Sequence, residues 1–196
     1  MSFEARFADV TQLIVSLHNV SPERLTALRG RLQHLQKLNF PPGINTGRGR
    51  PAEYGARQIL LLVLALELIV LGAAPERAAA VMRDQEDRVR AAVRKALEDI
   101  GNETADSERT VFLRLEPVAL FDRDPNLGFG ALPEIAQFLR KTALLDGFWR
   151  HALVNLSGLI DYAAKWAANV GEEGGRVFCS DLEEWSRTPS EKRHVN

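Results

Sequence analysis

The sequence Asn45-Thr-Gly-Arg-Gly-Arg-Pro-Ala-Glu-Tyr54 is a short basic loop that leads into the longest apolar run of the chain, Ile59 to Leu71. Glu67 interrupts this run and Gly72 closes it. A helix that is apolar around most of its circumference is typical of a protein core. The run is shorter than the ~20 residues that cross a bilayer, and it carries a charge. We therefore expect a central core helix and no membrane span.

The charge of the chain is distributed unevenly. The 196 residues carry a net charge of −1, and contents of 45% hydrophobic and 26% charged residues are typical of a soluble globular protein. Between Ser21 and Arg57, however, seven Lys or Arg residues accompany only Glu23 and Glu53, a local balance of +5 that leaves −6 for the remainder. Such asymmetry indicates a region that binds a polyanion.

Cysteine content and the first residues bear on the compartment. Cys179 is the single cysteine, which excludes a disulfide framework and a thiolate metal site within the chain. Met1 to Phe7 contain no basic segment followed by an apolar one, so no secretion signal is expected. We expect a cytoplasmic protein.

Two helices joined by a tight turn are predicted near the start. Apolar residues recur at helical spacing from Phe7 to His18. Asn19 to Pro22 is a turn and a new helix start, because Asn tolerates the left-handed conformation, Ser caps a helix and Pro suits its first position. The second helix would bury Leu25, Leu28, Leu32 and Leu35, with Gly30 as a point where it could end or bend. The pair is a helix-turn-helix candidate.

A wing is predicted between this pair and the core helix. Ile44–Thr46 and Ala52–Tyr54 are long enough only for two short strands, and Gly47 and Gly49 supply the positive backbone angles of a tight hairpin tip. Arg48 and Arg50 on this tip have nothing local to pair with, which suits contact with phosphates. The alternative is an ordinary surface loop.

The remainder is predicted to alternate helix and strand. Pro75 to Asp99 reads as one long helix whose stripe of small apolar residues would pack on a second copy of the chain. Beyond a polar break at Gly101–Ser107 we expect strands at Thr110–Leu115 and His151–Leu156. Two helices are predicted there as well, at Pro133–Leu145 and Ser157–Val170, the second capped by Ser157, with a Pro/Gly loop at Asp122–Leu132. The predicted class is mainly α (α+β), with segments 1–82 (winged helix-turn-helix), 75–100 (linking and dimerisation helix), 108–171 (small α+β region) and 172–196 (loosely attached or disordered tail).

The second helix has a polar side that suits a DNA groove. At 100° per residue, the side opposite the leucines carries small and polar residues, with Arg24 and Arg31 on one edge and Arg29 on the other. Small groups would then face base edges and guanidinium groups would face phosphates. The alternative is that this is the ordinary solvent-facing side of a surface helix, which is polar in any protein. The order helix-turn-helix, tip and helix favours DNA binding.

Residues from about Phe7 to Met82 resemble the DNA-binding domain of MerR-type transcriptional regulators. The resemblance rests on Val20-Ser-Pro-Glu-Arg-Leu25, Leu28-Arg29, Arg50 through Tyr54, and a helix ending at Leu71-Gly72 before Pro75-Glu-Arg77. Gly30-Arg31 replaces the usual tyrosine pair of that family. The resemblance implies a homodimer on a palindromic operator, with Arg29, Arg48, Arg50 and Tyr54 gripping phosphates. Bound to DNA, such a protein would be nucleoid-associated.

The sequence thus predicts a DNA-binding transcription regulator without a cofactor. The predicted DNA-binding residues are Arg24, Thr26, Ala27, Arg29, Arg31, Gln33, Arg48, Arg50, Tyr54 and Arg57. A contact with RNA polymerase is left open. The alternative is a protein–protein interaction module in which the apolar helix and the strand at Thr110 dock a partner.

Enzyme motifs are weak in this chain. The four histidines, at positions 18, 34, 151 and 194, show no metal-ligand spacing. Asp122 and Asp124 suit a turn better than a magnesium site. Gly128-Phe-Gly130 lacks the third glycine of a nucleotide loop, and Ser157 has no nucleophile elbow around it. We predict that the protein is not an enzyme.

Overall fold

A computed structural model describes residues 2–44, 51–100, 108–115, 127–142 and 151–188. The described chain is mainly helical, with two small antiparallel sheets, which confirms the predicted fold class at that level. The predicted hairpin tip, including Arg48 and Arg50, lies outside the described residues, as do Asp122, Asp124 and His194.

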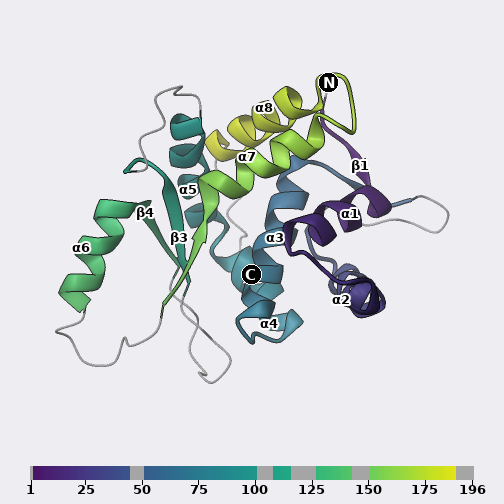
Figure 1. Ribbon diagram of the computed structural model, residues 1–196, viewed down its shortest axis with the longest axis horizontal. Helices are drawn as coiled ribbons and strands as arrows, with labels where there is room; N and C mark the ends of the chain where they lie inside the picture. Colours follow the sequence, from purple (N-terminus) through teal and green to yellow (C-terminus); the bar gives the residue numbers. More distant parts are fainter. Residues whose placement is uncertain (1, 45–50, 101–107, 116–126, 143–150, 189–196) are drawn as a thin grey trace, which may run out of the picture.

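Helix α3 (Ala56–Val70) is the central core helix that the apolar run predicts. Every residue from Ile59 to Leu66 is buried, and α3 runs through the middle of the molecule in Figure 1. Gly72, with a φ of 97°, adopts the left-handed conformation that follows a helix end. Helix α4 (Pro75–Asp84) then packs against α3.

The first two helices form where they are predicted. Helix α1 (Phe7–Leu17) is followed by Asn19 in the left-handed conformation, with a φ of 47°. The short 3-10 helix η1 (Pro22–Arg24) leads into α2 (Leu25–Lys37), which continues through Gly30 without a break. Because α2 buries leucines on both sides of Gly30, tertiary packing outweighs the weak helix propensity of one glycine.

The strand at Tyr54 pairs with a different partner from the one predicted. Strand β2 (Glu53–Tyr54) is antiparallel to β1 (Ala5–Arg6) at the start of the chain, and Ile44 is buried outside any strand. The N-terminus is fixed there because the Phe3 ring packs edge-on against Trp166 and Phe178. Within the described residues, the N-terminal strand β1 is therefore the partner of β2 in the two-stranded sheet.

The predicted single helix from Pro75 to Asp99 is two helices. Helix α4 ends at Asp84, and α5 (Glu86–Ile100) begins after Gln85, whose carbonyl accepts hydrogen bonds from the amides of Arg88 and Val89. The apolar stripe of α5 is covered by α7 (Leu156–Ala167) and α8 (Gly174–Arg187) of the same chain. Val89 and Val93 are fully buried. The predicted dimerisation surface is thus wrong, because it lies in the core.

The second half contains a three-stranded antiparallel sheet in the order β4–β3–β5. Its strands are β3 (Val111–Leu115), β4 (Gly128–Ala131) and β5 (Ala152–Asn155), and α6 (Leu132–Thr142) follows β4. The strands near Thr110 and His151 and the helices near Pro133 and Ser157 are confirmed. Both strands are shorter than predicted, both helices begin one residue earlier, and residues 143–145 of the first predicted helix lie outside the described residues. Strand β4, by contrast, lies within the stretch predicted to be a loop.

Residues 172–188 of the predicted loose tail are ordered, and residues 189–196 lie outside the described residues. Helix α8 packs along α7 and α5, with Phe178 and Leu182 fully buried (Figure 1). The helices meet closely, since a Cβ at Gly174 would lie 2.0 Å from the carbonyl oxygen of Ala167. One hydrophobic cluster joins the helices of both halves with the sheet, so the polar break at 101–107 does not separate two cores. No helix in the described ranges is long and apolar enough to cross a membrane.

Candidate nucleic-acid interface

Helix α2 lies at the periphery of the molecule, away from the three-stranded sheet (Figure 1). Its inner side buries Leu28, Leu32 and Leu35. Two polar contacts attach it to α4: Nε2 of His34 lies 2.6 Å from Oε1 of Glu76, and Nη2 of Arg83 donates to the carbonyl oxygen of Leu38 at 2.6 Å. The Arg83 contact holds the C-terminal end of α2, and the His34–Glu76 pair, whose side chains are 44% and 58% exposed, joins the solvent-facing part of the helix to α4.

The outer side of α2 is basic at its edges and small or polar along its centre. The exposed residues include every α2 residue that the sequence predicts for DNA contact, together with Arg24 from η1: Arg24, Thr26, Ala27, Arg29, Arg31 and Gln33. Gly30 and Lys37 are exposed beside them. Lys37 was missing from the predicted set, although its position on the helical wheel marked it.

The cations of this outer side have no partner among the described residues. Within the described residues, no hydrogen bond, ion pair or ring contact involves the side chain of Arg24, Arg29, Arg31 or Lys37. Among the described residues, the Glu23 carboxylate accepts a hydrogen bond from the Ser21 hydroxyl at 3.0 Å, and the Glu76 carboxylate is paired with His34. The four positive charges are therefore available to an external anion.

Arginines on neighbouring helices are used differently. Nη2 of Arg57 lies 2.9 Å from Oε1 of Glu86, and its guanidinium lies over the Trp185 ring. Arg94 donates to the carbonyl oxygen of Ser186 at 2.7 Å. Arg57, a predicted DNA contact, thus belongs to an internal network, since a carboxylate from a distant helix neutralises it.

Tyr54, another predicted phosphate contact, faces the core. It is 1% exposed, and its hydroxyl accepts a hydrogen bond from Nε2 of Gln36 at 2.6 Å. Burial raises the pKa of the phenol, and the hydrogen bond from Gln36 offsets part of that rise. In this position Tyr54 supports α2 from inside and does not reach a phosphate.

The Tyr54→Phe substitution tests this structural role. Removing the acceptor of the Gln36 hydrogen bond should lower the free energy of unfolding by about 1 kcal/mol. The affinity for duplex DNA should stay within twofold of the wild type, measured by fluorescence anisotropy beside a thermal melt. Weaker DNA binding at unchanged stability would instead return Tyr54 to the DNA-contacting set.

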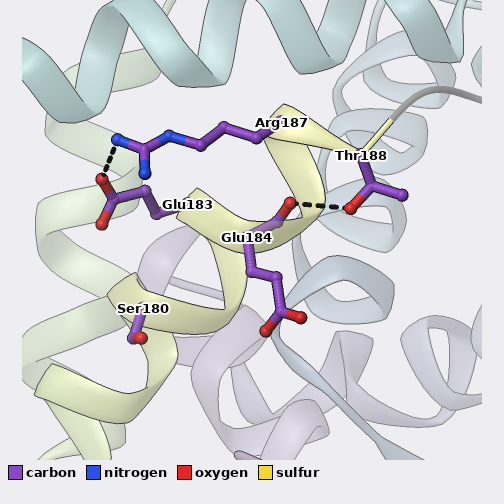
Figure 2. Close-up of a pocket in the computed structure, with 5 residues that line it drawn as sticks. All are labelled: Ser180, Glu183, Glu184, Arg187 and Thr188. Carbon is purple, nitrogen blue, oxygen red and sulfur yellow. Dashed lines mark hydrogen bonds and ion pairs between the residues drawn. The ribbon is translucent and has the colours of Figure 1, made fainter.

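A surface hollow on α8 provides no comparable site. Figure 2 shows its lining: Ser180, Glu183, Glu184, Arg187 and Thr188. The Arg187 guanidinium pairs with the Glu183 carboxylate at 2.6 Å, and the Thr188 hydroxyl donates to the carbonyl oxygen of Glu184 at 3.0 Å. The Arg187, Glu183 and Thr188 side chains are thus engaged along α8 itself, and the shallow arrangement does not make them converge on a ligand.

The described cysteine, serine and glycine residues that were considered for enzyme chemistry lie in structural environments. No cluster of three or more potential metal ligands (His, Cys, Asp or Glu) occurs among the described residues. Burial, and then the nearby Asp161, raise the pKa of Cys179, which keeps it a thiol. The Ser157 hydroxyl accepts a hydrogen bond from the amide of Val111, and it is Asn155, not Ser157, that caps α7. Gly128 and Gly130 lie in strand β4.

Comparisons with known proteins identify no relative. No family model, curated protein or solved structure matches this chain. The resemblance of its N-terminal part to MerR-type regulators therefore stays a prediction.

Proposed function

We propose that this protein binds double-stranded DNA through the outer side of α2. The observation that carries the proposal is the set of four exposed cations without a partner in the part of the chain that the structure describes, at positions 24, 29, 31 and 37. They border a strip of small and polar residues formed by Thr26, Ala27, Gly30 and Gln33. Charge complementarity to a phosphate backbone is the simplest use of such a surface.

The dimensions of an α-helix fit the major groove of DNA. An α-helix with side chains is about 10–12 Å across, and the major groove of B-form DNA is about 12 Å wide. With α2 in the groove, Arg24 and Arg31 on one edge and Arg29 on the other would reach phosphates. Thr26 and Gln33 would face base edges, where hydroxyl and amide groups discriminate between bases.

The proposal extends to transcription regulation by a homodimer on a palindromic operator, as the resemblance implies. A dimer would place two copies of α2 on one side of the duplex, one or more helical turns apart. Its interface would have to lie outside the apolar stripe of α5, since Val89 and Val93 are buried within one chain.

A protein-interaction role has less support. That alternative needs α3 and the strand near Thr110 as docking surfaces. The middle of α3 is buried, and so are Val111, Leu113 and Leu115 of β3. Apart from Val70 at the end of α3, which is 69% exposed, neither element presents a large exposed apolar side chain among the described residues.

The triple substitution Arg24→Ala, Arg29→Ala and Arg31→Ala tests the proposal. If three phosphate contacts are lost, the affinity for a mixed-sequence 30-bp duplex in about 50 mM salt should fall by at least about a hundredfold. The melting temperature should hardly change, because exposed side chains without partners contribute little to stability. Fluorescence anisotropy and circular dichroism measure the two effects.

A matched control removes the same number of charges elsewhere. Lys165 on α7 and Arg176 and Arg187 on α8 are exposed cations in ion pairs within their own helices. Replacing these three with Ala should leave the affinity within about threefold of the wild type. Equal losses in both triple variants would mean that overall charge, not α2, governs binding, and would contradict the proposal.

A further inference from the structure

Gly30 occupies the centre of the outer side of α2 and is not required by the fold. A Cβ built at this position would meet no atom within 4 Å, and its φ is an ordinary helical one, outside the positive range that favours glycine. Any small side chain could therefore stand here. In the interior of a helix, glycine is also less favourable than alanine, because it loses more backbone entropy on folding.

The residues around Gly30 indicate a function for a position without a side chain. At 100° per residue, Arg29 and Arg31 lie 100° to either side of Gly30 around the helix axis. Thr26 and Ala27, one turn earlier on the same outer side, are also short and exposed. Gly30 therefore leaves the helix backbone uncovered between the arginines on its two sides. Their long side chains project further from the helix axis than any atom of Gly30.

We propose that Gly30 is where the backbone of α2 comes closest to the floor of the DNA major groove, so that the absence of a side chain sets how deeply the helix docks. This inference rests on the proposed function. Close approach brings Thr26 and Gln33 to base edges while Arg29 and Arg31 reach phosphates on opposite walls. A bulky residue at position 30 would lift the helix and separate Thr26 and Gln33 from the base edges, while the longer side chains of Arg29 and Arg31 would still reach phosphates.

The same geometry selects DNA over duplex RNA. The major groove of B-form DNA is wide enough for an α-helix, whereas that of A-form RNA is deep and too narrow for side chains to read. A helix that depends on entering a groove should therefore discriminate between the two duplexes. A helix that only touches phosphates should not.

The test uses the full chain and a duplex that the wild type enriches from a randomised DNA pool. Gly30→Ala and Gly30→Leu should both raise the melting temperature, by about 2–4 °C, because each replaces a helical glycine. Gly30→Leu should weaken binding to the enriched duplex about tenfold or more, and Gly30→Ala clearly less. Binding to a random duplex, which depends on phosphates, should change less than threefold in either variant.

Gly171 is the matched control, because it is exposed and a Cβ there would also meet nothing within 4 Å. Gly171→Leu should bind the enriched duplex like the wild type. If Gly30→Leu does so as well, the close-approach inference is wrong while DNA binding by α2 stands. Equal affinity for an RNA duplex of the same sequence also overturns the groove assignment. A wild type that enriches no duplex contradicts both this inference and the proposed function.

Discussion

The substitution Val93→Glu is expected to abolish the stable fold. Val93 is fully buried on α5, on the side that α7 and α8 cover. A carboxylate placed there has no described partner and must either remain charged in an apolar environment or take up a proton. We expect the free energy of unfolding to fall by more than about 4 kcal/mol, a large part of the 5–15 kcal/mol typical of a domain.

Thermal melting followed by circular dichroism measures this loss, and Ala91→Glu is its control. Ala91 lies two residues earlier on the same helix and is only partly buried, so its replacement should cost about 1 kcal/mol or less. A Val93→Glu variant that folds normally and differs from the wild type only in dissociating from a dimer would show that this stripe is an interface between chains. That outcome would contradict the packing described above.

Removal of the Glu86 carboxylate should have the second large effect. The carboxylate lies 2.9 Å from both Nη2 of Arg57 and Nη2 of Arg90, and it accepts a hydrogen bond from the Trp185 indole at 3.2 Å. Its side chain is 14% exposed. Glu86→Ala leaves Arg90, whose side chain is 11% exposed, and the more exposed Arg57, at 32%, without their counter-ion, which should cost about 3–5 kcal/mol.

The damage should concentrate at the end of α8. Arg90 donates to the carbonyl oxygens of Trp185 and Thr188 and thereby holds the C-terminal end of α8. Because Glu86 orients the Arg90 guanidinium, its removal should loosen that end of the helix. Hydrogen exchange should therefore accelerate most in residues 182–188. Glu183→Ala, which breaks an exposed pair with Arg187, should cost less than about 1 kcal/mol. Similar costs for the two variants would mean that the Glu86 network is not what fastens α8.

The elements that sequence predicts well have a local apolar pattern. Helices α1, α2, α3 and α7 each repeat apolar residues at a spacing that fits one buried side or a fully buried helix. The break at Gln85 carries no such signal, because the apolar positions of α4 and α5 continue in phase across it. Strand β1 is two residues long and exists only through its pairing with β2.

Helix α8 was not predicted, although its sequence is amphipathic. Its buried residues Phe178, Leu182 and Trp185 are spaced by four and three, as in any amphipathic helix. They stand among glycines and charges, however, and α8 packs not only on the adjacent α7 but also on α5, about 90 residues earlier in the chain. The sequence alone does not reveal those partners.

The predicted DNA-binding residues also fall into two groups, those placed by a local apolar pattern and those placed by a partner distant in sequence. The outer side of α2 was predictable, because four leucines on one side of a helix determine which residues face out. The positions of Tyr54 and Arg57 were not, because each depends on one partner that is distant in sequence. Gln36 engages the hydroxyl of Tyr54, and Glu86 pairs with Arg57.

The salt dependence of duplex binding tests DNA recognition by α2 most directly. For each phosphate contact, the slope of log affinity against log salt concentration is about −0.9. The wild type should therefore show a slope about 2.7 steeper than the Arg24→Ala, Arg29→Ala, Arg31→Ala variant, and the control variant in Lys165, Arg176 and Arg187 should match the wild type. A wild-type affinity that is independent of salt, or equal slopes in all three proteins, would contradict the account.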